Sequence, residues 1–150
     1  MNALAMAPGR RIVASTCLRR LPRGDGMSEK LLLCIDDDRD FLRVLQVTFE
    51  ASGYDVLTAR DGPTALALFS DLPVDLVVLD YTMPKMNGAE VARSLRQRKP
   101  TIPILMLSAH IERPADVSGL IDDYAVKAEE SASLVSRIER LLADSSEACA

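Results

Sequence analysis

VDLVVLDYTMPKMNG, residues 74–88, is the stretch that decides the fold. Four apolar residues at 76–79 run directly into Asp80, and turn residues follow at once, including Pro84 and the Asn87–Gly88 pair. A short apolar run that ends at turn residues is typical of a strand buried on both faces of a parallel sheet. A carboxylate at the end of such a strand costs free energy unless its charge is used, which makes Asp80 a candidate functional residue.

The chain from residue 30 onward alternates short apolar runs with helical periodicity. Strands are expected at 30–35, 54–59, 74–79, 102–107 and 124–127. Helices are expected after Asp38, over 61–69, over 89–97, more weakly within 114–121, and around 134–142. Five strands that alternate with five helices predict a doubly wound α/β domain, in which a five-stranded parallel sheet carries helices on both faces. This domain is expected to fill residues 30–143.

Composition and charge exclude some classes of function. The 150 residues are 48% apolar and 27% charged, and the apolar runs are too short for a span of the bilayer, so no membrane partner is expected. The first 26 residues hold five arginines and one acid, so this segment carries +4 and the remainder −8 within a net charge of −4. An acidic body argues against nucleic-acid binding and is compatible with a carboxylate site for a cation.

The two ends and the cysteines complete this outline. Residues 1–29 are expected to be a flexible basic extension, and residues 144–150 a flexible tail. Three cysteines without metal-ligand spacing favour the reducing cytosol, so a cytoplasmic protein is expected.

Polar residues with a possible shared role follow four of the five expected strands, whereas the second ends at Ala59 and Arg60 without an obvious role. Asp36, Asp37 and Asp38 come after the first strand, Asp80 ends the third, Ser108 follows the fourth and Lys127 ends the fifth. Ligands of doubly wound sheets bind beyond the carboxyl ends of the strands, so these groups are expected to meet. Asp38 is expected to cap a helix. The other carboxylates would repel one another unless a cation such as Mg²⁺ joined them, and Lys127 and Ser108 would then complete a phosphoryl site.

The chain resembles the receiver domains of response regulators in two-component signalling. The matching segments are LLLCIDDD, DLVVLDYTMPKMNG, ILMLSAH and DDYAVK, which span about residues 30–143. The resemblance implies a flavodoxin-like (βα)5 fold with strand order 2-1-3-4-5. It also implies a signalling domain rather than an enzyme, whose chemistry is limited to its own phosphoryl transfer and autodephosphorylation.

The resemblance also implies a role for each site residue. Asp80 would accept a phosphoryl group from a sensor histidine kinase or a histidine phosphotransfer protein. Mg²⁺ would be held by Asp36, Asp37, Asp80 and the main-chain carbonyl of Thr82. The remaining roles are phosphoryl binding by Lys127 and Ser108, an aromatic switch at Tyr124, and tuning of dephosphorylation by the side chains of Thr82 and His110.

Two departures from the family pattern stand near the fifth strand. Receivers usually have a proline with a cis bond after the lysine, whereas here Ala128 follows Lys127. A cis bond before a residue other than proline costs ~2.5–4 kcal/mol, so we predict a trans bond and a shifted loop. The residues before Asp122 are bulkier than is usual. The face made by the fourth helix, the fifth strand and the last helix is therefore expected to bind an unusual output partner.

Alternative interpretations remain open from the sequence. The main one is a free-standing receiver, a monomer or a phosphorylation-dependent dimer, that acts by protein contact or in a phosphorelay. A degenerate receiver that serves as a docking module without phosphorylation is a second. A phosphohydrolase of the haloacid-dehalogenase type is a third, because Asp36–Asp38 supply its Asp-x-Asp motif, but this interpretation leaves Asp80 and its turn unexplained.

Overall fold

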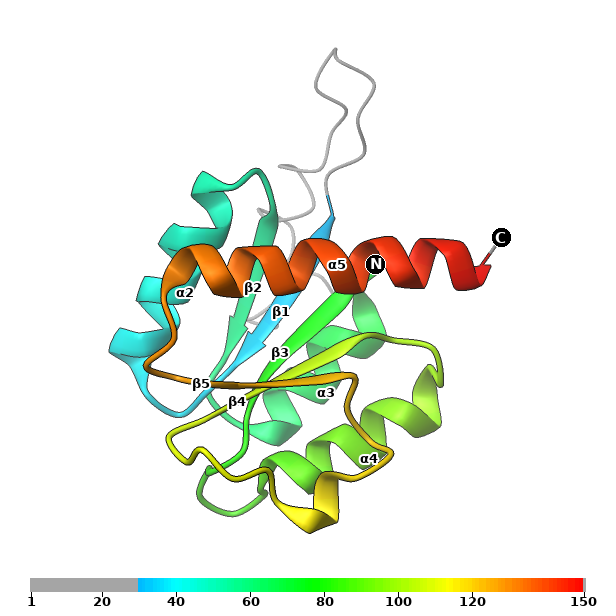
Figure 1. Ribbon diagram of the computed structural model, residues 1–150. Helices are drawn as coiled ribbons and strands as arrows, with labels where there is room; N and C mark the ends of the chain where they lie inside the picture. The colour runs from blue at the N-terminus through cyan, green and yellow to red at the C-terminus, as the bar shows by residue number, and fades with distance from the viewer. Residues whose placement is uncertain (1–29, 150) are drawn as a thin grey trace, which may run out of the picture.

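A single parallel sheet organises the part of the chain that the structure, a computed structural model, describes, residues 30–149 (Figure 1). The expected extension at 1–29 lies outside these residues. The elements follow one another in the order β1 Leu31–Ile35, α2 Arg39–Ala51, β2 Asp55–Ala59, α3 Gly62–Asp71, β3 Leu76–Asp80, α4 Gly88–Arg98, β4 Ile104–Ser108, the 3₁₀ turn η2 Ala115–Val117, β5 Asp123–Val126 and α5 Ser131–Cys149.

The sheet has the strand order β2-β1-β3-β4-β5 with every neighbouring pair parallel. Both the expected order and the expected doubly wound class are confirmed. The register sets Ile35 of β1 opposite Leu79 of β3, and Asp80 of β3 opposite Leu107 of β4. The residues that follow β1, β3 and β4 therefore reach one edge of the sheet at nearly the same level.

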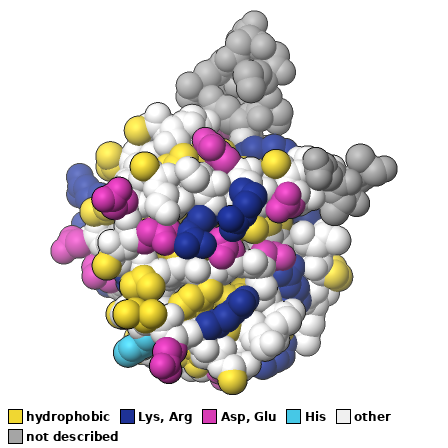
Figure 2. All heavy atoms as spheres, viewed as in Figure 1, with side chains coloured by type: hydrophobic (Ala, Val, Ile, Leu, Met, Phe, Trp, Pro, Cys, Tyr) yellow, Lys and Arg dark blue, Asp and Glu magenta, His cyan; other side chains and the backbone are white. Residues whose placement is uncertain are grey.

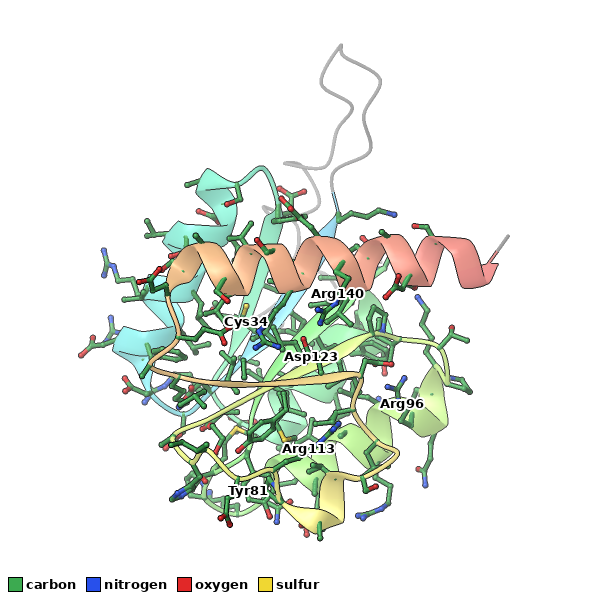
Figure 3. All side chains as sticks on the ribbon, viewed as in Figure 1. Cys34, Tyr81, Arg96, Arg113, Asp123 and Arg140 are labelled. Carbon is green, nitrogen blue, oxygen red and sulfur yellow. The ribbon has the colours of Figure 1, made fainter. Side chains whose placement is uncertain are left out.

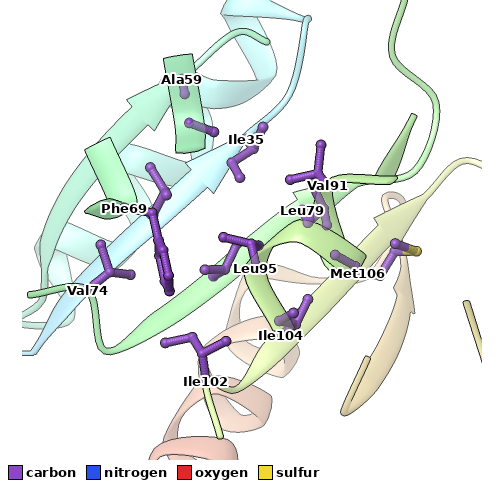
Figure 4. Close-up of a cluster of buried hydrophobic side chains, with 14 of the residues drawn as sticks. Ile35, Ala59, Phe69, Val74, Leu79, Val91, Leu95, Ile102, Ile104 and Met106 are labelled. Carbon is purple, nitrogen blue, oxygen red and sulfur yellow. The ribbon is translucent and has the colours of Figure 1, made fainter. Parts of the chain in front are cut away.

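Helices cover both faces of the sheet. In Figure 1, α2 and α5 lie on one side, and α3 and α4 lie on the other. Each side has its own buried apolar cluster, because residues along every strand alternate between the two faces. Figure 4 shows the cluster under α3 and α4, where Phe69 and Leu95 pack on Leu79 and Ile104. The two clusters explain why the strands are apolar on both faces.

Side-chain caps fix where three helices begin. The carboxylate of Asp38 accepts hydrogen bonds from the main-chain N–H groups of Asp40 (3.0 Å) and Phe41 (3.2 Å), as expected for a capping residue. Asp61 accepts from the N–H of Thr64 at the start of α3. Asn87 and Glu90 form a reciprocal capping box at the start of α4. These caps begin the helices directly after the loops that carry the site.

Two helix predictions were wrong. Within 114–121 the structure has only the 3₁₀ turn η2, because Pro114 precedes it and Gly119 takes the left-handed conformation, with φ of 77°. Val117 and Ile121 are still buried against the core, so the segment buries its apolar residues without forming an α-helix. The last helix, expected around 134–142, extends from Ser131 to Cys149 and so includes most of the expected flexible tail, because its sequence contains neither glycine nor proline.

No helix between residues 30 and 149 combines the length and the apolar character that crossing a bilayer requires.

Candidate functional site

Asp80 ends β3 as a nearly buried carboxylate, 4% exposed. Burial and the nearby charge of Asp36 raise its pKa to about 7, although Lys127 acts in the opposite direction. The N–H of Thr82 lies 3.4 Å from Asp80 Oδ1, a long hydrogen bond that contributes little. Asp80 is thus an acid whose negative charge is poorly compensated by its surroundings.

Lys127 is the cation that reaches this carboxylate. Its Nζ lies 2.6 Å from Asp36 Oδ2 and 3.2 Å from Asp80 Oδ1, and it also sits 4.8 Å from the centre of the Phe41 ring. Burial alone would lower the pKa of Lys127, but its hydrogen bond to Asp36 and the charges of both acids outweigh burial and raise the pKa. One ammonium group therefore serves two buried carboxylates.

Three carboxylates converge on the same point. Asp36, Asp37 and Asp80 each offer an oxygen, and these oxygens lie within 4.8 Å of one another. Asp36 is 1% exposed, and its Oδ1 accepts a hydrogen bond from the N–H of Asp38 at 2.9 Å, which fixes its orientation. Hard divalent cations prefer such oxygen ligands, and one Lys does not balance three acids, so this donor set fits Mg²⁺.

Ser108 lies at the end of β4 beside Lys127. Its side chain is 1% exposed, and its Oγ accepts a hydrogen bond from the N–H of His110 at 3.1 Å. Its carbonyl accepts the main-chain N–H of Lys127 at 2.8 Å, which continues the β4–β5 pairing to the site. The side chain of His110 is exposed.

Tyr124 is half-buried on β5, and its hydroxyl is bonded to the segment after Ser108. The hydroxyl oxygen lies 2.7 Å from the carbonyl of His110 and 3.1 Å from that of Glu112. Ile111, which follows His110, is 84% exposed. Figure 2 shows apolar side chains gathered on the surface near the histidine. The predicted switch residue thus contacts the loop that Ser108 begins.

The turn after Asp80 requires glycine at residue 88. The N–H of Gly88 donates to the carbonyl of Tyr81 at 2.8 Å, which closes the turn. A Cβ atom at residue 88 would lie 2.6 Å from the carbonyl oxygen of Asp80 and 2.8 Å from Cα of Tyr81. Lys85 takes a left-handed conformation, with φ of 71°, which is uncommon for a residue with a side chain. The turn therefore packs closely against the main chain of Asp80 and Tyr81.

The predicted trans bond between Lys127 and Ala128 is confirmed, since the described residues contain no cis peptide bond. Although no proline follows Lys127, its ammonium group still forms ion pairs with Asp36 and Asp80. The structure thus brings together Asp36, Asp37, Asp80, Ser108 and Lys127, with Thr82 beside them.

Sequence reasoning missed several contacts around the site. The contact between the ring of Phe41 and Lys127 is one that the sequence does not indicate. The hydroxyl of Tyr81 contacts the carboxylate of Asp116 in η2, with distances of 3.0 and 3.1 Å. Tyr81 adjoins Asp80, but Asp116 is far along the chain, and a periodic pattern does not reveal such a pair.

Comparison with known proteins identifies the class to which this fold and site belong. The sequence matches the family model of the response regulator receiver domain over residues 32–139. The chain belongs to this family, whose members are signalling domains that interact with histidine kinases and bind Mg²⁺ in an acidic pocket. Because the receiver model spans residues 32–139, the match argues against the alternative of a haloacid-dehalogenase-type phosphohydrolase.

Two curated relatives are similar in sequence. The alkaline phosphatase synthesis transcriptional regulatory protein PhoP of Bacillus subtilis is 41% identical over 116 residues, which are 75% of this chain and 48% of the relative. The transcriptional regulatory protein CpxR of Escherichia coli is 40% identical over 114 residues, 74% of this chain and 48% of the relative. The chain therefore spans about half the length of these relatives.

Two solved structures are similar in fold. Chemotaxis protein CheY4 of Vibrio cholerae has a TM-score of 0.72 at 27% identity, and the match covers 75% of this chain and 98% of CheY4. The response regulator TrrA of Thermotoga maritima, solved in complex with Mg²⁺ and BeF, has a TM-score of 0.70 at 31% identity, with 75% and 98% covered.

Proposed function

We propose that this receiver domain accepts a phosphoryl group on Asp80 from the phosphohistidine of a sensor kinase or histidine phosphotransfer protein. An oxygen of Asp80 forms the new bond to phosphorus, the phosphorus–nitrogen bond breaks, and the nitrogen keeps its electron pair. The product is an acyl phosphate. The observation that carries this proposal is a buried carboxylate, with a pKa of about 7, that shares one lysine with a second buried acid.

The same pocket would hold Mg²⁺ through Asp36, Asp37, Asp80 and the carbonyl of Thr82. When bound, the ion would supply positive charge beside the phosphoryl oxygens. Lys127 would pair with a phosphoryl oxygen, because the charge of Asp80 is consumed when the acyl phosphate forms. The cluster of carboxylate oxygens and the position of Nζ between two acids support these roles.

The switch would begin at Ser108. Its buried hydroxyl would turn to donate a hydrogen bond to a phosphoryl oxygen, in place of accepting from the N–H of His110. Tyr124 is bonded to the same segment, so the segment and the ring would move together. The side chains of Thr82 and His110 would flank the phosphoryl group and set the rate of its hydrolysis.

The output would pass through the surface formed by η2, β5 and α5. We infer a cytoplasmic protein that acts there by protein contact or as one step of a phosphorelay, as a monomer or as a dimer formed after phosphorylation. The free-standing arrangement and the absence of a nucleic-acid partner stay predictions, because the chain spans about half the length of relatives named transcriptional regulatory proteins.

A small phosphodonor tests the proposal without the cognate kinase. The purified chain is incubated with Mg²⁺ and acetyl phosphate, and its intact mass is measured. We expect one phosphoryl adduct that survives acid, is lost in base, requires Mg²⁺ and is absent from Asp80→Asn. An adduct that persists in Asp80→Asn would contradict the proposal. A wild-type protein that folds and binds Mg²⁺ but forms no adduct would instead favour the docking module without phosphorylation.

A further inference from the structure

The loop between β5 and α5 carries Lys127, the only described cation that forms ion pairs with the carboxylates of Asp36 and Asp80. Lys127 follows β5 directly, and Ala128 after it has no ring to restrict φ. Ala128 is exposed, so its side chain does not anchor the loop in the core. The main-chain bond from the N–H of Lys127 to Ser108 fixes one side of the lysine. On the other side, the N–H of Glu129 donates to the carbonyl of Val126 at 2.9 Å, and the side chain of Glu129 makes a further contact.

Glu129 provides a charged contact on that side. Its two carboxylate oxygens accept hydrogen bonds from Nε (2.7 Å) and Nη2 (2.9 Å) of Arg137 on α5. This is the paired geometry in which an arginine binds a carboxylate most specifically. The two side chains are 22% and 27% exposed, so the pair is partly shielded from solvent. The hydrogen bonds from Arg137 lower the pKa of Glu129.

Arg137 is itself held at the other end of the strand. Its Nη1 lies 2.9 and 2.8 Å from the two carboxylate oxygens of Asp123, the first residue of β5. Arg140 also contacts Asp123, at 2.5 Å from Oδ2, and Figure 3 shows Arg140 extending from α5 toward Asp123. One guanidinium group thus joins the start of β5 to the residue two positions after Lys127.

We propose that Glu129 and Arg137 are positioning residues that hold the β5–α5 loop and thereby keep the ammonium group of Lys127 between Asp36 and Asp80. The effect on reactivity rests on the proposed phosphorylation of Asp80. The residues do not touch the pocket, so they act only through Lys127. The bidentate contact adds to the main-chain bond of Glu129 and further restricts a loop in which Ala128 has no ring to fix φ.

A double-mutant cycle separates this role from a general contribution to stability. The initial rate of Asp80 phosphorylation by acetyl phosphate, at saturating Mg²⁺, is measured for Glu129→Ala in the wild-type chain and in the Lys127→Ala chain. Because misplacement of a charged group in a reaction site is costly, we expect a loss of about tenfold in the first case. We expect no further loss in the Lys127→Ala chain, since the lysine that the loop positions is absent.

Arg140→Ala is the matched control, because Arg140 contacts Asp123 but has no described contact with Glu129. Its phosphorylation rate is expected to equal that of the wild type. A wild-type rate in Glu129→Ala would overturn the proposal. An equal loss in both backgrounds would also overturn it, since Glu129 would then act independently of Lys127.

Hydrogen exchange tests the loop without phosphorylation. The amides of Lys127 and Glu129 donate to Ser108 and Val126, so their exchange reports whether the loop is held. We expect faster exchange over residues 127–130 in Glu129→Ala and no change in Arg140→Ala. If the wild-type chain takes no phosphoryl group but the exchange result holds, the proposed function fails while the anchoring stands. Unchanged exchange in Glu129→Ala would refute the anchoring itself.

Discussion

Two groups of aspartates at opposite ends of the strands show how position decides the use of a charge. Asp36, Asp37 and Asp80 lie at the carboxyl edge, where Lys127 bridges two of them. Asp122 and Asp123 lie at the start of β5, where Asp122 binds Arg96, and Asp123 binds Arg137 and Arg140. Figure 2 shows Lys and Arg side chains interspersed with Asp and Glu side chains on the face with α5.

The pKa values follow this difference in compensation. Burial would raise the pKa of Asp123, but the hydrogen bonds and charges supplied mainly by Arg137 outweigh burial and lower it. Burial and Asp36 raise the pKa of Asp80 to about 7, against the opposing effect of Lys127. The ion pairs of Asp123 join β5 to α5, whereas the charge of Asp80 stays poorly compensated, as the proposed Mg²⁺ and phosphoryl site requires.

Removal of Lys127, which pairs with both Asp36 and Asp80, should have the largest effect. Lys127→Ala leaves two buried carboxylates without their ion pair, so the free energy of unfolding in metal-free buffer should fall by roughly 3 kcal/mol. The phosphorylation rate should fall by about 10²-fold, because a group that stabilises the charge of the transferred phosphoryl is lost. Urea unfolding and intact mass measure the two effects.

The control is Lys99→Ala, which removes an exposed lysine; equal losses in both variants would contradict the account.

Arg96 should be the most sensitive residue in the compensated region. Its guanidinium donates to the carbonyls of Leu120 (3.0 Å), Pro100 (2.9 Å) and Ile102 (2.5 Å), besides its ion pair with Asp122. Arg96→Met leaves these acceptors without a donor, so the free energy of unfolding should fall by about 2 kcal/mol. Urea unfolding measures the loss, with exposed Arg93→Met on the same helix as control. A loss no greater than that of Arg93→Met would show that these bonds are dispensable.

The contributions of Asp80 and Asp123 to the free energy of unfolding should change with pH in opposite directions. The folded pKa of Asp80 is raised, so its contribution to stability is present below the ordinary value of 3.8 and is lost as pH rises toward about 7. The folded pKa of Asp123 is lowered, so its contribution is present above 3.8 and is lost at lower pH. In metal-free buffer, stability should therefore fall by on the order of 2 kcal/mol between pH 5 and pH 8.

Unfolding in urea with a chelator measures this slope. Asp80→Asn should remove it and leave the acid-induced loss of stability below pH 4 unchanged. If the stability of Asp80→Asn still falls between pH 5 and pH 8, a group other than Asp80 causes the fall.

The smallest of these effects concerns Mg²⁺ affinity. A proton on Asp80 competes with the ion, and with a pKa of about 7 the carboxylate is mostly protonated at pH 6 and mostly ionised at pH 8. Calorimetric titration should show affinity about tenfold weaker at pH 6 than at pH 8. The same affinity at both values would mean that Asp80 does not titrate in this interval.

The sequence predicted the features that depend on neighbours along the chain. The strands, their parallel order and the residues at the carboxyl edge follow from apolar runs, turn residues and the resemblance of the motifs. The arginine contacts were not predictable in this way, because Arg96 and Asp122 are 26 residues apart and Arg137 and Asp123 are 14 apart. Such pairs depend on how helices pack over strands, and many surface arginines have similar local sequence.

The helix errors have a related cause. Within 114–121 the apolar residues suggested a helix, but Pro114 and Gly119 restrict it to one 3₁₀ turn. At the other end, the polar residues after 143 suggested a loose tail, although α5 continues to Cys149. The prediction at 114–121 was wrong because it gave too little weight to the proline and the glycine. The prediction after residue 143 was wrong because polar residues do not by themselves end a helix.

The most direct test of the account is to locate the phosphoryl group in the wild-type chain. Borohydride reduces an aspartyl phosphate to homoserine, and cleavage after Arg60 and Lys85 isolates residues 61–85, which contain Asp80. After treatment with acetyl phosphate and Mg²⁺, the account predicts homoserine at residue 80 and at no other acid of the chain. Homoserine at residue 36 or 37, with Asp80 unchanged, would contradict it.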